Sequence, residues 1–353
     1  CGAAPSTRPS STGPTSPSPS CRRAWRSLSL GLAAGLGLAG AAWAQALPPL
    51  ELPVRCEIGR DCFVQNYVDA DPTPDRKDYT CGPFTYDGHK GTDIRVPDLA
   101  AMQRGVTVVA AAAGTVRAIR DEMPDISIRD QAPGAVANRE AGNAVVVVHP
   151  GGWEAQYSHL KRGSVVVKPG DTVAVGQPLG QIGLSGNTEF PHLHFELRRN
   201  GQPVDPFVGP DDPPGCGQTG TPLWSKAALQ ALAYRPGALL AAGFLPGPPT
   251  EAAARSGPAL ADSLPRSAPA LVFWTDTMTV LAGDTIALRL LGPDGAELAK
   301  SDIRVERPRA NQSAFVGRKQ PQGGWPQGRY VGEYRLTRGG ATVAEARRTL
   351  TVD

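Results

Sequence analysis

Short strand-like segments separated by glycine, proline and aspartate fill residues 47–214. The run Val145–Val148 consists of four consecutive valines, which suits a strand that is buried on both faces. Two turn clusters, Lys168–Asp171 and Val175–Pro178, bracket a very short strand. This spacing favours a compact β-sandwich or barrel over a helical fold. The strands that we expect are Gly105–Ala112, Gly114–Arg120, Asn143–His149, Trp153–Ser158, Ser164–Val167, Pro178–Gly183 and His192–Arg198.

Residues 267–353 show the same kind of pattern and predict a second β domain. The turn sequences Pro293-Asp294-Gly295 and Gly339-Gly340 separate its apolar runs. Seven short strands at close spacing indicate a small immunoglobulin-like sandwich. The segment holds no histidine or cysteine, so we expect it to bind, position or pack rather than to catalyse. Its expected strands are Ala270–Trp274, Met278–Leu281, Thr285–Leu291, Asp302–Glu306, Ser313–Arg318, Arg329–Thr337 and Ala341–Val352.

Two stretches interrupt these β patterns. Residues 121–142 are polar and of mixed charge, and we interpret them as an inserted loop. Loops of this length within a compact domain are often functional. Residues 217–266 are rich in alanine, leucine, proline and glycine, and they predict a linker with short helices at Ser225–Tyr234 and Ala238–Phe244.

The composition narrows the class of protein. With 41% hydrophobic and 20% charged residues, the chain is neither disordered throughout nor a polytopic membrane protein. The 41 glycines and 35 prolines among 353 residues favour turns, short strands and linkers over long helices. The formal net charge is +3, but residues 1–44 contain four arginines and no acid, so the rest of the chain is close to neutral. Net charge therefore gives no support for a nucleic-acid partner.

The amino-terminal segment has the pattern of a secretory signal. The basic stretch Cys21–Arg26 precedes an apolar run, Leu28–Ala42, and the small residues Ala42 and Ala44 flank a tryptophan. The apolar run is about 15 residues long, short of the roughly 20 that span a bilayer. We expect a periplasmic or secreted protein with no stable membrane insertion after cleavage. A retained membrane anchor is the alternative, and we treat residues 1–20 as an extension outside the fold.

Cysteine usage agrees with export. Four cysteines would remain after cleavage, and an even number in an exported chain indicates disulfides. Of the three possible pairings, we favour Cys56–Cys62, a tight local loop, together with Cys81–Cys216, which joins the two ends of one domain. A zinc–thiolate site is the alternative, although the chain contains no Cys-x-x-Cys pair.

These features together predict four segments. Residues 1–44 are the extension and the signal peptide, and residues 45–216 form a β domain that contains the inserted loop 121–142. The linker with short helices occupies residues 217–266. The small β-sandwich follows at residues 267–353.

The candidate chemistry lies in the five histidines of the chain. His89 and Asp93 are four residues apart, a spacing that lets an imidazole and a carboxylate point to the same side. His192 and His194 would share one face of a strand. Two imidazoles and one carboxylate around Zn²⁺, with water in the open fourth position, are typical of catalytic zinc. Histidines outside such a ligand set, His159 among them, suit proton transfer near neutral pH.

Two other residues have plainer interpretations. His149 ends the valine strand before a proline, and we interpret it as structural. Glu196 lies on the expected strand face of His192 and His194. It either orients a metal ligand or is an ordinary strand carboxylate.

Three motifs carry a family resemblance: Gly88-His89-Lys90-Gly91-Thr92-Asp93, Tyr157-Ser158-His159-Leu160 and Pro191-His192-Leu193-His194-Phe195-Glu196. Together they resemble the lysostaphin and LytM-type zinc peptidases, which cut peptide cross-links in peptidoglycan. The glycine-rich turn sequence Gly170–Gly180 is also similar to that family. The resemblance covers roughly Tyr79 to Asp205.

The resemblance implies a fold, a site and a substrate. The implied fold is an antiparallel two-layer β peptidase core, barrel-sandwich-like, that carries a groove. His89, Asp93 and His194 correspond to the ligands of one zinc ion per chain. His159 and His192 correspond to the two non-ligand histidines that handle the water and the oxyanion. The implied partner is a peptidoglycan peptide, and we expect a D-Ala–diaminopimelate link as the bond cut, with pentaglycine or a protein substrate left open.

Departures from the family pattern keep other functions open. Glu189 and Phe190 stand before His192 where the family has a different sequence, and the insertion 121–142 would change one wall of the groove. Some members of the family have lost ligands and act only as activators of amidases. A non-catalytic murein-binding activator is therefore the alternative function, and the retention of all five site residues favours the enzyme. A lipoyl-type carrier would need a modifiable lysine at a hairpin tip, where Ser185–Asn187 offers none.

Overall fold

The computed structural model describes residues 47–211, 215–218 and 220–353, which all belong to one compact unit. The predicted extension and signal peptide at residues 1–44 lie outside the described residues. Among the residues that the structure describes, no helix is long and apolar enough to cross a membrane.

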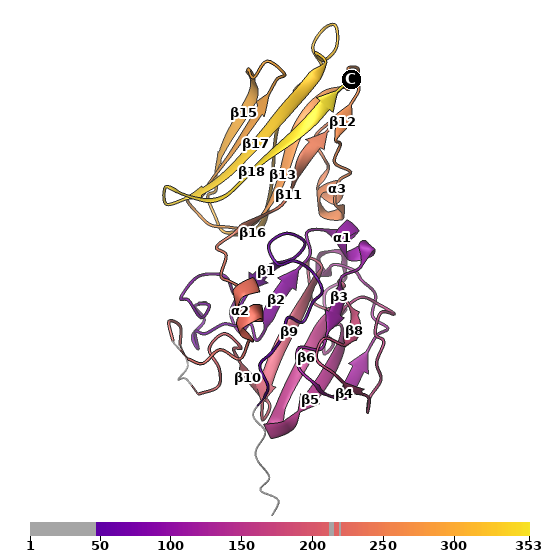
Figure 1. Cartoon of the computed structure of the whole chain (residues 1–353), viewed down its shortest axis with the longest axis vertical. Helices are drawn as coiled ribbons and strands as arrows, with labels where there is room; N and C mark the ends of the chain where they lie inside the picture. Colours follow the sequence, from indigo (N-terminus) through magenta and orange to yellow (C-terminus); the bar gives the residue numbers. More distant parts are fainter. Residues whose placement is uncertain (1–46, 212–214, 219) are drawn as a thin grey trace, which may run out of the picture. The chain divides into compact units, whose positions relative to one another are not determined.

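The amino-terminal β region is built on an antiparallel sheet of eight strands (Figure 1). Seven follow the order β1-β2-β9-β6-β5-β4-β7, and β10 pairs with β9. A separate two-stranded sheet consists of β3 and β8. The bounds are β1 Phe63–Asn66, β2 Thr92–Arg95, β3 Thr107–Val109, β4 Gly114–Arg120, β5 Asn143–His149, β6 Trp153–Leu160, β7 Thr172–Val173, β8 Pro178–Gln181, β9 His192–Arg199 and β10 Gln202–Val204.

The central strands of this sheet are buried on both faces. One face packs into an apolar core, to which β5 contributes Val145 and Val147 and β9 contributes Leu193 and Phe195. The opposite face of β9 carries His192 and Glu196, which are also buried. The sheet therefore offers a water-shielded face for polar side chains.

Helix α1 (Leu99–Arg104) follows β2. It begins where the Asp98 side chain accepts a hydrogen bond from the Ala101 amide.

The predicted strands of this region are confirmed at β4 and β5, with the expected bounds. The strand predicted at Ser164–Val167 is wrong, because this segment is an extended connection without regular structure. The Asp121 carboxylate accepts hydrogen bonds from the Ser164 and Val165 amides at 3.2 and 3.3 Å. The segment also bonds to β8, where the Val166 amide donates to the Leu179 carbonyl at 3.0 Å, but it forms no regular ladder. The whole of 121–142 is described, and the regular structure within it is a single 3-10 turn, η1 (Ile128–Asp130).

The carboxy-terminal region contains two further sheets. A three-stranded sheet has the order β11-β13-β16, and a five-stranded sheet has the order β12-β18-β17-β14-β15. Side chains of both sheets share one apolar cluster, which includes Phe273 from the first sheet and Leu288 and Tyr330 from the second. The bounds are β11 Ala238–Leu245, β12 Ser263–Leu264, β13 Ala270–Val280, β14 Thr285–Leu291, β15 Glu297–Arg304, β16 Arg309–Lys319, β17 Gly328–Arg338 and β18 Ala341–Val352.

Two expectations for this part of the chain are corrected. The segment Ala238–Phe244, expected to be a short helix, is strand β11, which pairs antiparallel with β13. Its alanines and leucines favour a helix locally, but pairing with a neighbouring strand overrides that weak preference. The two strands expected at Ala270–Trp274 and Met278–Leu281 form one continuous strand, β13. The other helices are α2 (Lys226–Ala231), within the expected Ser225–Tyr234, and α3 (Glu251–Ser256).

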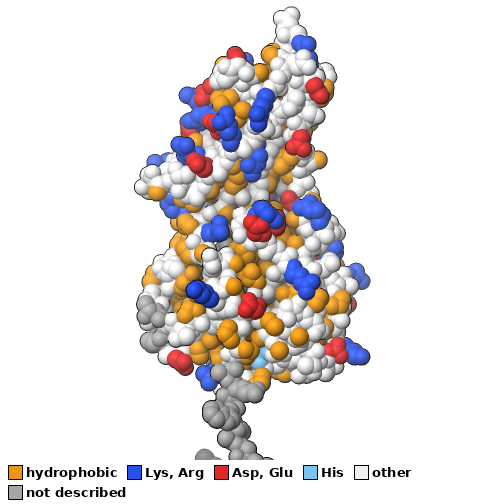
Figure 2. Space-filling view, viewed as in Figure 1, with side chains coloured by type: hydrophobic (Ala, Val, Ile, Leu, Met, Phe, Trp, Pro, Cys, Tyr) orange, Lys and Arg blue, Asp and Glu red, His pale blue; other side chains and the backbone are white. Residues whose placement is uncertain are grey.

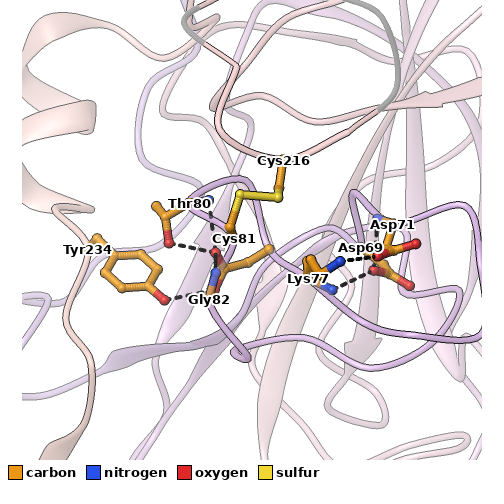
Figure 3. Close-up of a disulfide and its surroundings, with 9 residues drawn as sticks. Asp69, Asp71, Lys77, Thr80, Cys81, Gly82, Cys216 and Tyr234 are labelled. Atoms are coloured by element: carbon orange, nitrogen blue, oxygen red, sulfur yellow. Dashed lines mark hydrogen bonds and ion pairs between the residues drawn. A yellow bond between two sulfur atoms is a disulfide. The ribbon is translucent and has the colours of Figure 1, made fainter.

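Both favoured disulfides are present. Cys56 is bonded to Cys62, and Cys81 is bonded to Cys216 across 135 residues of sequence. Figure 3 shows the second bond beside Tyr234, whose hydroxyl donates to the Asp78 carboxylate at 2.7 Å. The bond joins the loop before β2 to the segment that follows β10, so it closes the amino-terminal region as the sequence predicts.

Charged side chains of both signs are interspersed with apolar ones on the face shown in Figure 2. No single-sign charged patch dominates that view of the described residues. This distribution agrees with a chain that is close to neutral beyond its basic first segment.

Candidate metal centre

The site is assembled where β2 and β9 lie side by side. In the antiparallel pairing of these strands, Asp93 lies opposite His194. Directly opposite residues in such a pair have their side chains on the same face. His89 lies in the turn before β2, and its amide donates to the Tyr86 carbonyl at 3.0 Å. The sheet register thus brings together residues about 100 positions apart in sequence.

His89, Asp93 and His194 form a tight cluster of potential metal ligands. His89 Nε2 lies 3.1 Å from both Asp93 Oδ1 and His194 Nδ1, and His194 Nδ1 lies 2.9 Å from Asp93 Oδ1. Tetrahedral zinc with bonds of about 2.0–2.2 Å separates neighbouring ligand atoms by roughly 3.3–3.6 Å. The observed spacings are close to this range. Two imidazole nitrogens and one carboxylate oxygen therefore fit a zinc-type ion in both chemistry and distance.

Neighbouring groups orient the three side chains. His89 donates its Nδ1–H to the Tyr67 carbonyl oxygen at 2.6 Å, which leaves the Nε2 lone pair free for a metal. Asn66 Nδ2 donates to Asp93 Oδ2 at 2.9 Å and leaves Oδ1 for the cluster. Burial opposes ionisation of Asp93, but the nearby imidazoles outweigh it and hold the pKa of this carboxyl well below its usual range. Asp93 is therefore a carboxylate at neutral pH.

Glu196 contacts the cluster from one side. Its Oε2 lies 3.8 Å from His194 Nε2, and its other oxygen accepts a hydrogen bond from Arg198 Nε at 2.8 Å. Burial disfavours the charged form, yet His194 and Arg198 together lower the Glu196 pKa to about 2. Of the two interpretations that the sequence left open, contact with a candidate ligand favours an orienting role.

His159 and His192 lie next to the cluster. Their ring centroids are 4.6 Å apart, and His192 Nε2 lies 3.4 Å from Asp93 Oδ1. His159 donates its Nδ1–H to the Ser185 carbonyl oxygen at 2.7 Å. His192 Nδ1 lies 3.0 Å from both the Phe190 carbonyl oxygen and Thr188 Oγ1. In each ring the Nδ1 nitrogen is bonded to the protein, so the Nε2 nitrogen is turned toward the cluster, that of His192 lying near Asp93 Oδ1.

His159 has an unusual backbone and environment. Its φ angle is +60°, in the left-handed region that few non-glycine residues adopt. The Ala141 carbonyl accepts from its amide at 2.9 Å, and the Gly183 amide donates to its carbonyl at 3.0 Å. Burial, followed by the nearby His192 and His194, holds its pKa well below the usual value. The imidazole is therefore neutral at neutral pH and can accept a proton.

All five residues singled out from the sequence meet in this one place, whereas His149 lies apart. Its Nδ1–H donates to the Ala113 carbonyl at 2.8 Å at the end of β5. Three residues that contact the site could not be identified from the sequence. Asn66 bonds to Asp93, the Ser185 carbonyl bonds to His159, and Thr188 lies against His192. None of the three belongs to a motif, and only the fold brings them to the site.

Comparison with known proteins finds similarity in the part of the chain that contains this site. Residues 87–206 match the model of peptidase family M23. The chain is 38% identical over 100 residues to "DD-carboxypeptidase/endopeptidase Mpg" of Neisseria meningitidis, covering 28% of this chain and 21% of that protein. It is 42% identical over 65 residues to "Peptidoglycan DD-endopeptidase ShyA" of Vibrio cholerae, covering 18% of this chain and 15% of that protein.

Solved structures show a partial match as well. One is a zinc-containing peptidase from Vibrio cholerae, with 26% identity and a TM-score of 0.29 over 46% of this chain and 39% of that one. The chain spans only about a fifth of the length of the Neisseria meningitidis relative. Residues 87–206, which hold the His–Asp–His cluster, are therefore similar to peptidase family M23.

Proposed function

We propose that this protein is an exported zinc-dependent endopeptidase that cleaves peptide stems or cross-links of peptidoglycan. The observation that carries the proposal is the buried cluster of His89, Asp93 and His194 with two further histidines beside it. A catalytic zinc site has three protein ligands and an open position, and this donor set supplies three.

The proposed ligand atoms are His89 Nε2, Asp93 Oδ1 and His194 Nδ1 of one zinc ion per chain. When bound, zinc in such a site lowers the pKa of a water molecule and polarises a peptide carbonyl. Three neighbours would keep these ligands oriented. Asn66 contacts Asp93, the Tyr67 carbonyl contacts His89, and Glu196 contacts His194. Groups of this kind typically change metal affinity by about 10–100-fold when they are removed.

The proposed catalytic residues are His159 and His192. With Nδ1 bonded to the Ser185 carbonyl, His159 presents an Nε2 lone pair that can take the proton of the attacking water. His192 presents Nε2 from the neighbouring strand and, once protonated, can donate a hydrogen bond to the developing oxyanion or a proton to the leaving amine. We propose that the two rings share these roles, as the resemblance to the family implies.

The proposed substrate class follows the relatives. Both curated relatives described above carry the word endopeptidase in their names, and the name of the Vibrio cholerae protein specifies peptidoglycan. We propose a D-Ala–diaminopimelate link as the bond cut. Two disulfides support a periplasmic or secreted location, because such bonds persist in oxidising compartments.

We also propose the domain organisation inferred from the sequence, with a peptidase domain at residues 45–216, a linker at 217–266 and a β-sandwich at 267–353. Strands β11 and β12 lie within the proposed linker and pair with β13 and β18, so the sandwich would recruit two strands from it. We propose an immunoglobulin-like arrangement for the sandwich, supported by two sheets that enclose one apolar cluster.

Incubation of the purified protein with peptidoglycan sacculi tests the function. Mass spectrometry of the released muropeptides should identify one cleaved bond, and a zinc chelator should abolish release. The His149→Ala variant is a matched control, because it removes a histidine that lies apart from the cluster, and it should keep its activity. A protein that contains no stoichiometric zinc, or that releases the same fragments in chelator, would overturn the proposal. Binding to sacculi without cleavage would support the non-catalytic alternative.

A further inference from the structure

Arg95 is a fully buried cation on the same sheet face as the metal cluster. Arg95 is only 2% exposed to solvent. It follows Asp93 by two positions on β2 and lies directly opposite His192 on β9. Both relations put its side chain on the face of the site. A buried charge is costly unless its surroundings satisfy it, so this position calls for an explanation.

The guanidinium group is held from two directions. Within the amino-terminal region, Arg95 donates to Gln65 Oε1 at 2.6 Å and to the Pro97 carbonyl at 3.1 Å. From the carboxy-terminal region, Asn311 Oδ1 on β16 accepts from the same guanidinium at 2.5 Å. Asn311 Nδ2 in turn donates to Asp276 Oδ2 on β13 at 3.0 Å. Asn311 therefore bridges a buried cation and a buried carboxyl.

Charge supports this bridge. The Arg95 guanidinium is charged, because arginine is effectively always protonated in proteins. Burial raises the pKa of Asp276, while Arg95 and the hydrogen bonds from Asn311 and Ser313 oppose that rise. A planar guanidinium presents several donors in a fixed fork, which a lysine cannot reproduce.

The other side of the guanidinium faces the segment before His192. Its central carbon lies 4.5 Å from the centre of the Phe190 ring, a cation–π contact. The Phe190 ring centre is 5.1 Å from that of His192, and the Phe190 carbonyl lies 3.0 Å from His192 Nδ1. Phe190 therefore contributes to the packing of His192 and supplies one of the two contacts of its Nδ1, the other being Thr188 Oγ1.

We propose that Arg95 is a positioning residue, held by Asn311 of the carboxy-terminal sheets, that fixes Phe190 and through it the catalytic orientation of His192. The inference rests on the proposed function, because it assigns the purpose of the contact to catalysis by His192. It gives the carboxy-terminal region a role in turnover, although that region supplies none of the five site residues.

Kinetics of the full-length zinc-loaded protein on a cross-linked muropeptide test the chain of contacts. Arg95→Lys keeps the buried charge but loses the fork, and it should lower kcat about 10–100-fold with little change in KM or zinc content, as a slightly misplaced catalytic group does. Asn311→Ala should lower kcat about 3–10-fold by releasing Arg95. The control Gln312→Ala changes the next residue of β16, whose side chain donates to the Ser313 carbonyl, and should leave kcat unchanged. The double variant Arg95→Lys/Asn311→Ala should be no slower than Arg95→Lys alone, because both changes break one pathway.

Several results would overturn the inference. One is a kcat within twofold of wild type for Arg95→Lys, and another is additive losses in the double variant. A lower Tm with unchanged kcat would show that Arg95 only stabilises the fold. Crystal structures of zinc-loaded wild type and Arg95→Lys provide a readout that does not depend on activity. Displacement of Phe190 and His192 supports the inference, and an unchanged pair overturns it. If the wild type proves inactive on peptidoglycan, the proposed function fails, and the crystal structures still decide whether Arg95 positions His192.

Discussion

Strands β9 and β14 show how differently a β-strand can be used within this chain. In β14, buried Ile286, Leu288 and Leu290 alternate with partly exposed residues, as expected where one face meets the core and the other meets water. In β9, most residues are buried, including the polar His192 and Glu196. Because burial of polar groups is costly without partners, the second buried face of β9 must be satisfied by its surroundings. Buried polar side chains therefore distinguish the sheet that carries the candidate site from the sheet that contains β14.

The largest effect should come from removing a polar residue from that second face of β9. His194→Ala removes one of three proposed ligand atoms, so we expect loss of zinc and a fall in kcat of roughly a thousandfold or more. His159→Ala should keep stoichiometric zinc and still lose most turnover, because its side chain lies beside the cluster rather than within it. Metal analysis and muropeptide kinetics on the two variants separate these roles. If His194→Ala retains full zinc, the assignment of ligands is wrong.

A core substitution in β14 should have the opposite profile. Leu288→Ala removes a side chain that is completely buried in the carboxy-terminal cluster, and such changes cost about 2–5 kcal/mol of stability. Chemical denaturation should show this loss, whereas the zinc content of the folded protein should stay at wild-type level. The exposed Arg348→Ala on β18 is a surface control that should leave stability within about 0.5 kcal/mol. Loss of zinc from folded Leu288→Ala would contradict the expectation that the core of the carboxy-terminal region affects stability alone.

Much of this contrast could be predicted from the sequence. The apolar run between turns predicted β14 and the valine run predicted β5, since both signals are local. The five site residues could be selected because histidines are rare in this chain and three of the motifs that contain them match one family. The disulfide pairing followed from loop size and domain closure, and it is confirmed.

Contacts set by tertiary structure could not be predicted in this way. Strand β11 was mistaken for a helix because its alanines and leucines favour a helix until β13 pairs with them. Asn66 reaches Asp93 only through the pairing of β1 with β2, and Asn311 meets Arg95 from 216 residues away. A lone asparagine or arginine has no sequence pattern that reveals such a partner.

Asp205 is a buried acid in the amino-terminal region, and only one of its two carboxyl oxygens has a hydrogen-bond partner among the described residues. Its Oδ1 accepts from the Phe207 amide at 2.9 Å, while its Oδ2 is shielded from water and has no partner among the described residues. Burial raises the pKa of Asp205 to about 7. Between about pH 4 and pH 7 the folded state keeps a proton that the unfolded state releases, so the free energy of unfolding falls as pH rises through this window. With about 1.4 kcal/mol for each pKa unit, we expect a total fall of roughly 2–4 kcal/mol.

The Asp205→Asn variant tests this pH dependence, because an amide has nearly the same shape and does not titrate. Its denaturation midpoint, measured in chelator, should lose the downward slope between about pH 4 and pH 7, and its relative stability should be highest above pH 7. Parallel pH profiles for variant and wild type would show that Asp205 keeps an ordinary pKa in the fold.

The smallest effect, and one of opposite sign, should come from a partly buried acid with an exposed lysine as partner. Thr73 and then Lys77 donate to the Asp71 carboxylate, at 2.7 and 2.9 Å, and lower its pKa to about 2 (Figure 3 shows Asp71 and Lys77). A carboxyl with a lowered pKa stabilises the fold above its unfolded value near pH 4, and the contribution disappears as the pH falls toward 2. Asp71→Asn should therefore be slightly less stable than wild type at pH 7 and converge with it in acid, as measured by thermal denaturation from pH 7 down to pH 3. Solvent screens such pairs, so the difference should be small and should shrink further in high salt. A difference that persists undiminished in acid would mean that Asp71 acts through its shape rather than its charge, whereas Asp205 would remain the acid whose ionisation the fold resists.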